Sequence, residues 1–197
     1  MAGASRPASR MGSAPVGAAA LCLLLAACSP RFDWRDVRQP EAGYSVALPD
    51  KPQTVVRELA FEHPAGPVRA EMTMVSTGIG ASLFAVGTAR LPALAVDSPQ
   101  ALSATLDWFR DGLLRNVQAS TAEPVATPPP AGLGARRLLA AQGFTTSGVA
   151  GSGRPAQLAV RLYVVDDRLF QLVALGAEGE IPPQALETFF DSFRLTP

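Results

Sequence analysis

The sequence predicts an α+β domain in which helices cover a largely antiparallel sheet of about seven strands. Short segments of alternating apolar and polar residues lie on both sides of an amphipathic stretch at residues 98–117. Turn-forming Pro, Gly and Asp residues separate many of these segments by only a few positions, which favours antiparallel pairing. A second amphipathic stretch closes the chain. The expected order is therefore ββββ-α-βββ-α, with helices on the apolar faces of the sheet.

The first half of the chain contains four expected strands, at residues 44–48, 54–62, 68–74 and 82–91. The third is the clearest, because its two faces differ: Val68, Ala70, Met72 and Met74 alternate with Arg69, Glu71 and Thr73. The fourth is apolar on both sides. Turn-forming residues follow the first three strands.

Ser98 and Pro99 mark the expected start of the first helix. Ser is a preferred N-cap residue, and Pro is favoured at the first helical position. Apolar residues then recur at spacings of four, three, four and four, at Leu102, Leu106, Phe109, Leu113 and Val117. This pattern predicts a helix with one face buried in a core.

Three more strands and a last helix are expected in the second half. The proline-rich residues 120–132 cannot continue a helix and are interpreted as a surface connection. One strand is expected at residues 133–146, and two more form a hairpin around the Asp166-Asp167 turn. Pro182-Pro183 opens the last helix, whose apolar face contains Leu186, Phe189, Phe190 and Phe193.

The predicted core lies between the sheet and the first helix. Its sheet residues are Val68, Met72, Leu158, Val160 and Leu162, and its helix residues are Leu106, Phe109 and Leu113. These side chains share one face of each element, so burying them together removes a continuous apolar surface from water.

The first 27 residues have the features of a secretory signal. Arg6 and Arg10 precede an apolar run at residues 16–27, which ends in small residues. The run is shorter than the roughly 20 residues that a membrane-spanning helix needs. Leu25-Ala26-Ala27-Cys28 resembles the lipobox of bacterial lipoproteins, which implies cleavage before Cys28 and lipidation of its thiol. The alternative is a soluble secreted protein that is cut after Ala27, with Cys28 incidental.

These features divide the chain into a lipoprotein signal peptide at residues 1–27, a lipidated tether at residues 28–42 and a single domain at residues 43–197. Phe32 and Trp34 in the tether either contact the membrane interface or pack onto the domain.

Charge and cysteine content limit the function classes. The chain has 17 basic and 17 acidic residues, and removal of the signal leaves 15 against 17, about −2. This balance provides no electrostatic basis for binding nucleic acid. Cys22 lies in the signal and Cys28 would carry lipid, so the mature domain has neither a disulfide nor a free thiol.

No motif in the sequence indicates a catalytic centre. His63 is the single histidine, and no nucleophile-elbow pattern accompanies it. Residues 148–153 are glycine-rich but precede a strand, whereas a phosphate-binding loop precedes a helix. Asp166-Asp167 is better explained as a hairpin turn than as a calcium site. Three remaining pairs could suggest a site but have structural explanations. Glu58 with Glu62 and Asp107 with Asp111 are expected on solvated faces, and Met72 with Met74 is expected in the core. The sequence therefore predicts no catalytic, cofactor-binding or metal-binding residue, and no enzyme.

Three segments carry a resemblance to a known family: "GYSVALPDKP" near the start of the domain, "RLYVVDDRLFQLVAL", and "ALETFFDSFRL" at the end. Together they resemble the PsbP/Mog1-like fold and, within it, bacterial lipoproteins of the DcrB-like kind. The resemblance covers roughly residues 43–197. It implies an interaction or assembly factor rather than an enzyme.

The expected function is therefore a non-enzymatic interaction module in the cell envelope, held at the membrane by its lipid. Its partner would be an envelope protein or the cell wall. The alternative is a binder of a small apolar ligand or lipid, which needs an internal cavity. Ser29 follows Cys28 where an Asp would retain an enterobacterial lipoprotein at the inner membrane, so we expect the outer membrane, facing the periplasm.

Overall fold

A computed structural model describes residues 31–197, and a compact unit begins at Phe32. Within the described residues, seven strands form an antiparallel sheet in the order β3-β4-β5-β9-β8-β7-β6. Their bounds are β3 Gln53–His63, β4 Gly66–Ile79, β5 Ser82–Arg90, β6 Glu123–Val125, β7 Leu138–Val149, β8 Pro155–Val165 and β9 Arg168–Ala177. The α+β class and the antiparallel seven-stranded sheet are confirmed.

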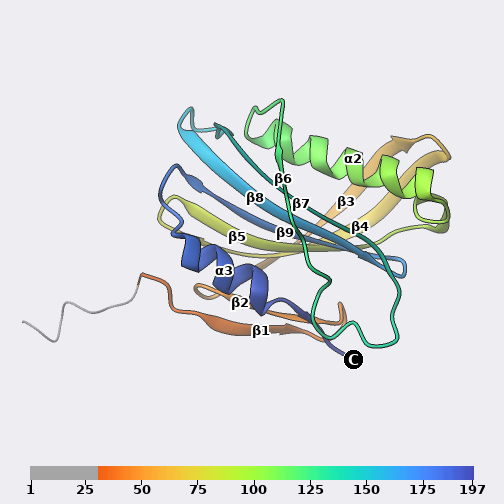
Figure 1. Ribbon diagram of the computed structural model, residues 1–197, viewed down its shortest axis with the longest axis horizontal. Coiled ribbons are helices and arrows are strands. Elements are labelled where there is room, and N and C mark those ends of the chain that lie inside the picture. Colours follow the sequence, from red (N-terminus) through yellow and green to blue (C-terminus); the bar gives the residue numbers. More distant parts are fainter. Residues whose placement is uncertain (1–30) are drawn as a thin grey trace, which may run out of the picture. The chain divides into compact units, whose positions relative to one another are not determined.

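Helices and a second sheet cover both faces of the main sheet (Figure 1). Helix α2 (Pro99–Asn116) lies over one face, and a short 3-10 turn, η1 (Ala93–Ala95), precedes it. Helix α3 (Pro183–Ser192) lies over the other face. A three-stranded sheet lies beside α3, in the order β1-β2-β10, with bounds Arg35–Gln39, Tyr44–Leu48 and Arg194–Leu195.

The core beneath α2 is the one that the sequence predicts. Val68, Met72, Leu158, Val160 and Leu162 are buried in one cluster with Phe109 and Leu113, and Leu106 packs at its edge. The expected helix start is also correct, because the Ser98 hydroxyl accepts a hydrogen bond from the Ala101 N–H at 3.1 Å. This bond satisfies one of the free main-chain donors in the first turn of α2.

A second core lies on the opposite face, under α3 and the small sheet. It contains Tyr44, Phe84, Phe170, Phe189 and Phe193, together with aliphatic residues of β2, β5 and β9. Phe84 and Phe189 are 0% exposed, and their ring centroids are 5.3 Å apart in an edge-to-face arrangement. Residues on both faces of the central strands are therefore buried, which explains why β5 is apolar on both sides.

The expected strand assignment is wrong for β2 and for residues 120–137, because the strand expected at residues 133–146 begins only at Leu138. Strand β2 was expected in the main sheet, but it pairs instead with β1 and β10. The seventh place in the main sheet belongs to β6, which lies within the proline-rich residues 120–132 and pairs with β7. Pro124 is tolerated there because β6 is the edge strand and can leave a main-chain donor position unpaired.

Residues 32–42, which were expected in the tether, belong to the compact unit. Strand β1 occupies most of the second half of residues 28–42 and pairs with β2 over five positions. Phe32 and Trp34 pack on Phe84, with ring centroids 6.1 and 6.0 Å away. The compact unit thus begins at Phe32, and both aromatic residues pack against its second core.

Because of Tyr44, we expect the stability of this second core to fall at alkaline pH. Burial raises the pKa of Tyr44 well above its ordinary value of about 10. The unfolded chain then releases the proton first as the pH rises past 10, so the free energy of unfolding falls there by up to about 1.4 kcal/mol per pH unit. We expect Tyr44→Phe to make this alkaline decline shallower by up to that amount. Urea unfolding at a series of pH values measures it, and equal slopes in both proteins would contradict the expectation.

Candidate binding groove

The single histidine has a structural position. Its side chain is buried, and the Ala65 N–H donates to Nδ1 at 3.1 Å. Nε2 therefore carries the proton and donates to the Ala101 carbonyl at 2.9 Å. The Nε2 bond connects the β3–β4 turn to the first turn of α2, and the two bonds together use both ring nitrogens of His63.

Most of the acidic residues that the sequence singled out have partners in ion pairs or turns. Asp166 accepts a hydrogen bond from the Arg137 N–H at 3.1 Å in the β8–β9 turn, and Asp167 pairs with Arg90 at 3.3 Å. Asp107 pairs with Arg110 on the exposed face of α2, and Glu58 pairs with Arg69 across β3 and β4. Among residues 31–197, no group of three His, Cys, Asp or Glu side chains could hold a metal ion. The expected lipidation residue, Cys28, lies outside the described residues.

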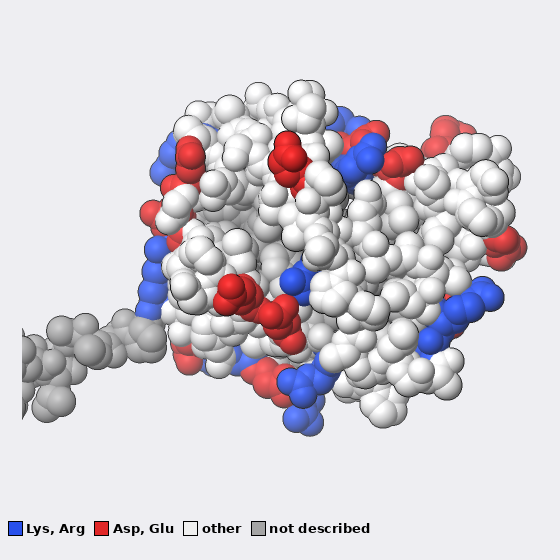
Figure 2. All heavy atoms as spheres, in the orientation of Figure 1, with Lys and Arg blue, Asp and Glu red and all other residues white. Residues whose placement is uncertain are grey.

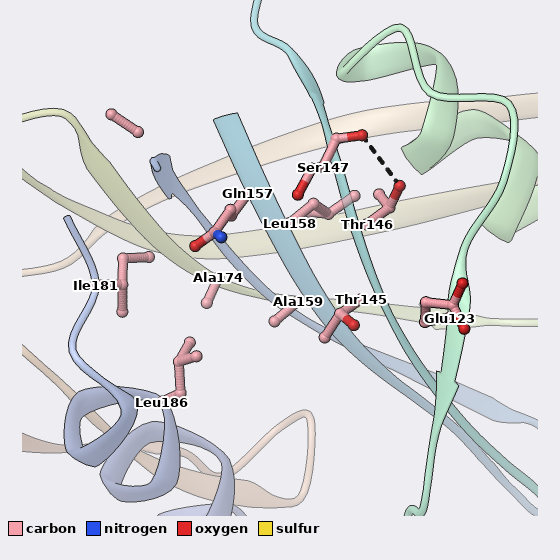
Figure 3. Close-up of a pocket in the computed structure, with 11 residues that line it drawn as sticks. Glu123, Thr145, Thr146, Ser147, Gln157, Leu158, Ala159, Ala174, Ile181 and Leu186 are labelled. Carbon is pink, nitrogen blue, oxygen red and sulfur yellow. Dashed lines mark hydrogen bonds between the residues drawn. The ribbon is translucent and has the colours of Figure 1, made fainter. Parts of the chain in front are cut away.

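A groove of about 330 Å³ lies between α3 and the β6–β7–β8 side of the sheet. Its base contains the small buried side chains Ala159 and Ala174 (Figure 3). Ile181 and Leu186 line the side formed by α3 and the loop before it, and Glu123 of β6 lines the opposite side. Around the base lie polar side chains of β7 and β8: Thr145, Ser147 and Gln157.

Strand register places the polar and small residues of the groove together. Thr145 is opposite Ala159, and Ser147 is opposite Gln157, in the pairing of β7 with β8. Because side chains two positions apart share a face, these four residues point to the same side of the sheet. A base of alanines leaves space that larger side chains would fill.

Arg161 continues the same face of β8 beyond Ala159. Its guanidinium pairs with Asp191 of α3 at 3.2 Å and lies 4.8 Å from the ring centroid of Phe190. The side chain is 18% exposed, and the ion pair and the cation–π contact together fix α3 against β8 at this end of the groove.

The groove was not predicted from the sequence. The small side chains of residues 81–96 could permit a ligand cavity, but Ala85, Ala89 and Ala95 are buried in the core. The sequence feature that could have indicated the groove is the residue pattern of β7 and β8. On one face of these strands, Thr145, Ser147 and Gln157 interrupt the apolar residues. The loop before α3 and strand β6 complete the site from distant parts of the chain.

Comparison with known proteins identifies no family. No protein-family model matches the chain, and no curated protein matches it. A similar solved structure is the protein of unknown function PA94 from Pseudomonas aeruginosa, with 13% sequence identity and a TM-score of 0.34. The similarity covers 78% of this chain and 85% of that protein, and it is too weak to support a statement about function.

Across residues 31–197, no helix combines the length and the apolar character needed to span a membrane.

Proposed function

We propose that the chain is a lipid-anchored cell-envelope protein whose PsbP/Mog1-like domain binds a segment of a partner protein and catalyses no reaction. The observation that supports binding is the groove, where a base of small apolar side chains is surrounded by hydroxyl and amide groups. Apolar surface with a few placed polar groups is typical of binding sites. A peptide can place an apolar side chain on the base and direct its main chain to the polar groups.

The alternative ligand, a small apolar molecule or lipid, fits the groove less well. Small-molecule sites have volumes of roughly 300 to 1,000 Å³ and enclose most of their ligand. The groove, at about 330 Å³, is near the lower limit, and Thr145, Ser147 and Gln157 in its lining are exposed to solvent. One or two side chains of a partner match this size better than a lipid.

The anchor assignment rests on the signal peptide and Cys28, and the missing Asp after Cys28 favours the outer membrane, facing the periplasm. Only residues 29–31 separate Cys28 from the start of the domain at Phe32. Three residues span at most roughly 11 Å when fully extended. The domain would therefore act close to the membrane surface.

Replacing Cys28 with Ser should abolish lipidation and leave the domain folded, because Cys28 precedes every element of the two cores. A single acyl chain binds a bilayer only reversibly, whereas a diacylglycerol with a further acyl group gives stable attachment. Mass spectrometry of the mature N-terminus and membrane fractionation measure the change. A wild-type N-terminus without lipid, or unchanged membrane partitioning of Cys28→Ser, would contradict the anchor and leave a soluble secreted domain.

Gln157→Trp should block the groove without disturbing the core, since Gln157 is exposed on β8 and Trp is favoured in strands. The matched control is Glu62→Trp, on β3 at the opposite edge of the sheet. After affinity isolation in detergent, a partner protein should accompany the wild type and Glu62→Trp but be lost from Gln157→Trp. A lipid in place of the protein would favour the alternative, and a partner retained by all three would contradict the proposed site.

A further inference from the structure

We infer that the groove selects a partner segment in which an apolar side chain is adjacent to Lys or Arg. This inference rests on the proposed function and specifies the chemistry of the partner. It follows from the charges that surround the apolar base of the groove.

Acidic side chains are present on both sides of the groove. Glu123 lines one side directly. Opposite it, Glu178 and Glu180 belong to the turn between Ala177 and Ile181, which both line the groove, and Glu187 follows Leu186 on α3. Figure 2 shows acidic atoms over α3 and over β6, on either side of the hollowed part of this face. We call Glu123, Glu178, Glu180 and Glu187 the acidic rim.

Basic residues are scarce in the segments that build the groove. Residues 116–135, 138–153 and 169–193 contain neither Lys nor Arg. Arg161 lies on the adjoining part of β8, but Asp191 neutralises it at 3.2 Å. Arg154, directly before β8, lines a neighbouring hollow that shares Ala177 with the groove. Acidic residues therefore outnumber the unpaired basic residues around the groove, and the groove carries a net negative charge.

Three residues of the acidic rim have no basic partner. Within the described chain, no Lys, Arg or His nitrogen lies within 4.0 Å of the carboxylates of Glu123, Glu178 or Glu187. All three residues are exposed, so their charges act on an approaching partner without first breaking an internal ion pair.

This combination of charge and shape defines the partner. The base of Ala159 and Ala174 accepts an apolar side chain, and the acidic rim favours a cation beside it. Charges around an interface mainly steer association and reject like-charged partners. A fatty acid or an anionic lipid headgroup would bring a negative group toward the acidic rim, so the same charges disfavour both.

Selection from a random peptide library displayed on phage tests the inference, with the detergent-solubilised full-length protein as the immobilised target. We expect selected peptides to carry Leu, Ile, Met or Phe beside Lys or Arg, and their binding to weaken as salt increases. Glu123→Lys should weaken the binding of a selected peptide by about threefold to tenfold, the range expected for reversal of one exposed charge. Glu62→Lys is the matched control, with the same charge change at the opposite sheet edge, and should alter binding by less than about twofold.

The outcomes separate this inference from the proposed function. Peptides that lack basic residues, yet lose binding to Gln157→Trp, would overturn the inference and leave the groove as the binding site. Equal effects of Glu123→Lys and Glu62→Lys would also overturn it. If no peptide is selected, or if Gln157→Trp binds the selected peptides as well as the wild type does, both the inference and the proposed function are wrong.

Discussion

Replacing Phe109 with Ala should lower the free energy of unfolding by about 3 to 5 kcal/mol, because a buried ring is removed and a cavity remains. Phe109 is 4% exposed in the core beneath α2. Its ring centroid lies 6.3 Å from that of Phe61 on β3 and 5.0 Å from that of Trp108 on the same helix, both in edge-to-face arrangements. Chemical denaturation followed by fluorescence measures the loss.

Asp111→Ala on the exposed face of the same helix is the control, and it should change the unfolding free energy by no more than about 0.5 kcal/mol. A loss below about 1 kcal/mol for Phe109→Ala would show that α2 does not present this face to the sheet.

Phe189→Ala should cost a similar amount, about 3 to 5 kcal/mol, on the other side of the sheet. Phe189 is 0% exposed and contacts the rings of Phe84 and Phe190, with centroids 5.3 and 5.0 Å away. The ring holds α3 against β5, so its removal should also loosen the α3 side of the groove.

Glu187→Ala, on the exposed face of α3, is the control for this helix. Because the main sheet separates Phe189 from Phe109, we expect the two losses to add to within about 0.5 kcal/mol. Typical domains have 5 to 15 kcal/mol of stability in total, so a combined loss of about 6 to 10 kcal/mol should leave the double variant with little of it. A full effect of Phe109→Ala with none from Phe189→Ala would contradict the second core.

The sequence correctly predicted the elements that are specified by their own residues. The Ser98-Pro99 start and the apolar stripe of α2 identify both the helix and its buried face. The Asp166-Asp167 turn, with alternating residues on either side, identifies the β8–β9 hairpin. In each case the residues that specify the element are close together in the chain.

Pairing between distant segments could not be predicted in the same way. Strand β1 contains Arg35, Asp36 and Arg38, and charged residues are typical of edge strands. With so many charges, β1 lacks the apolar alternation by which a strand is recognised in a sequence. Strand β6 is three residues long and includes Pro124. Strand β2 has a clear strand pattern, but that pattern does not specify whether its partner is β3 or β1.

The candidate groove was unpredictable for the same reason. Glu123, Thr145, Gln157 and Leu186 come from four elements, and none of them belongs to a recognisable motif. Only the three-dimensional arrangement shows that alanines at the base leave space and that acidic residues lie on both sides.

The central claim is that the groove contacts a partner protein, and site-specific photo-cross-linking in intact cells tests it most directly. A photoreactive phenylalanine derivative at position 157 of the full-length protein lies at the groove, and the same residue at position 62 lies at the opposite edge of the sheet. We expect position 157 to give an adduct of defined mass with one envelope protein, mapped by mass spectrometry to a segment with an apolar residue beside Lys or Arg. Position 62 should give none. An adduct at position 62 with none at position 157 would contradict the account.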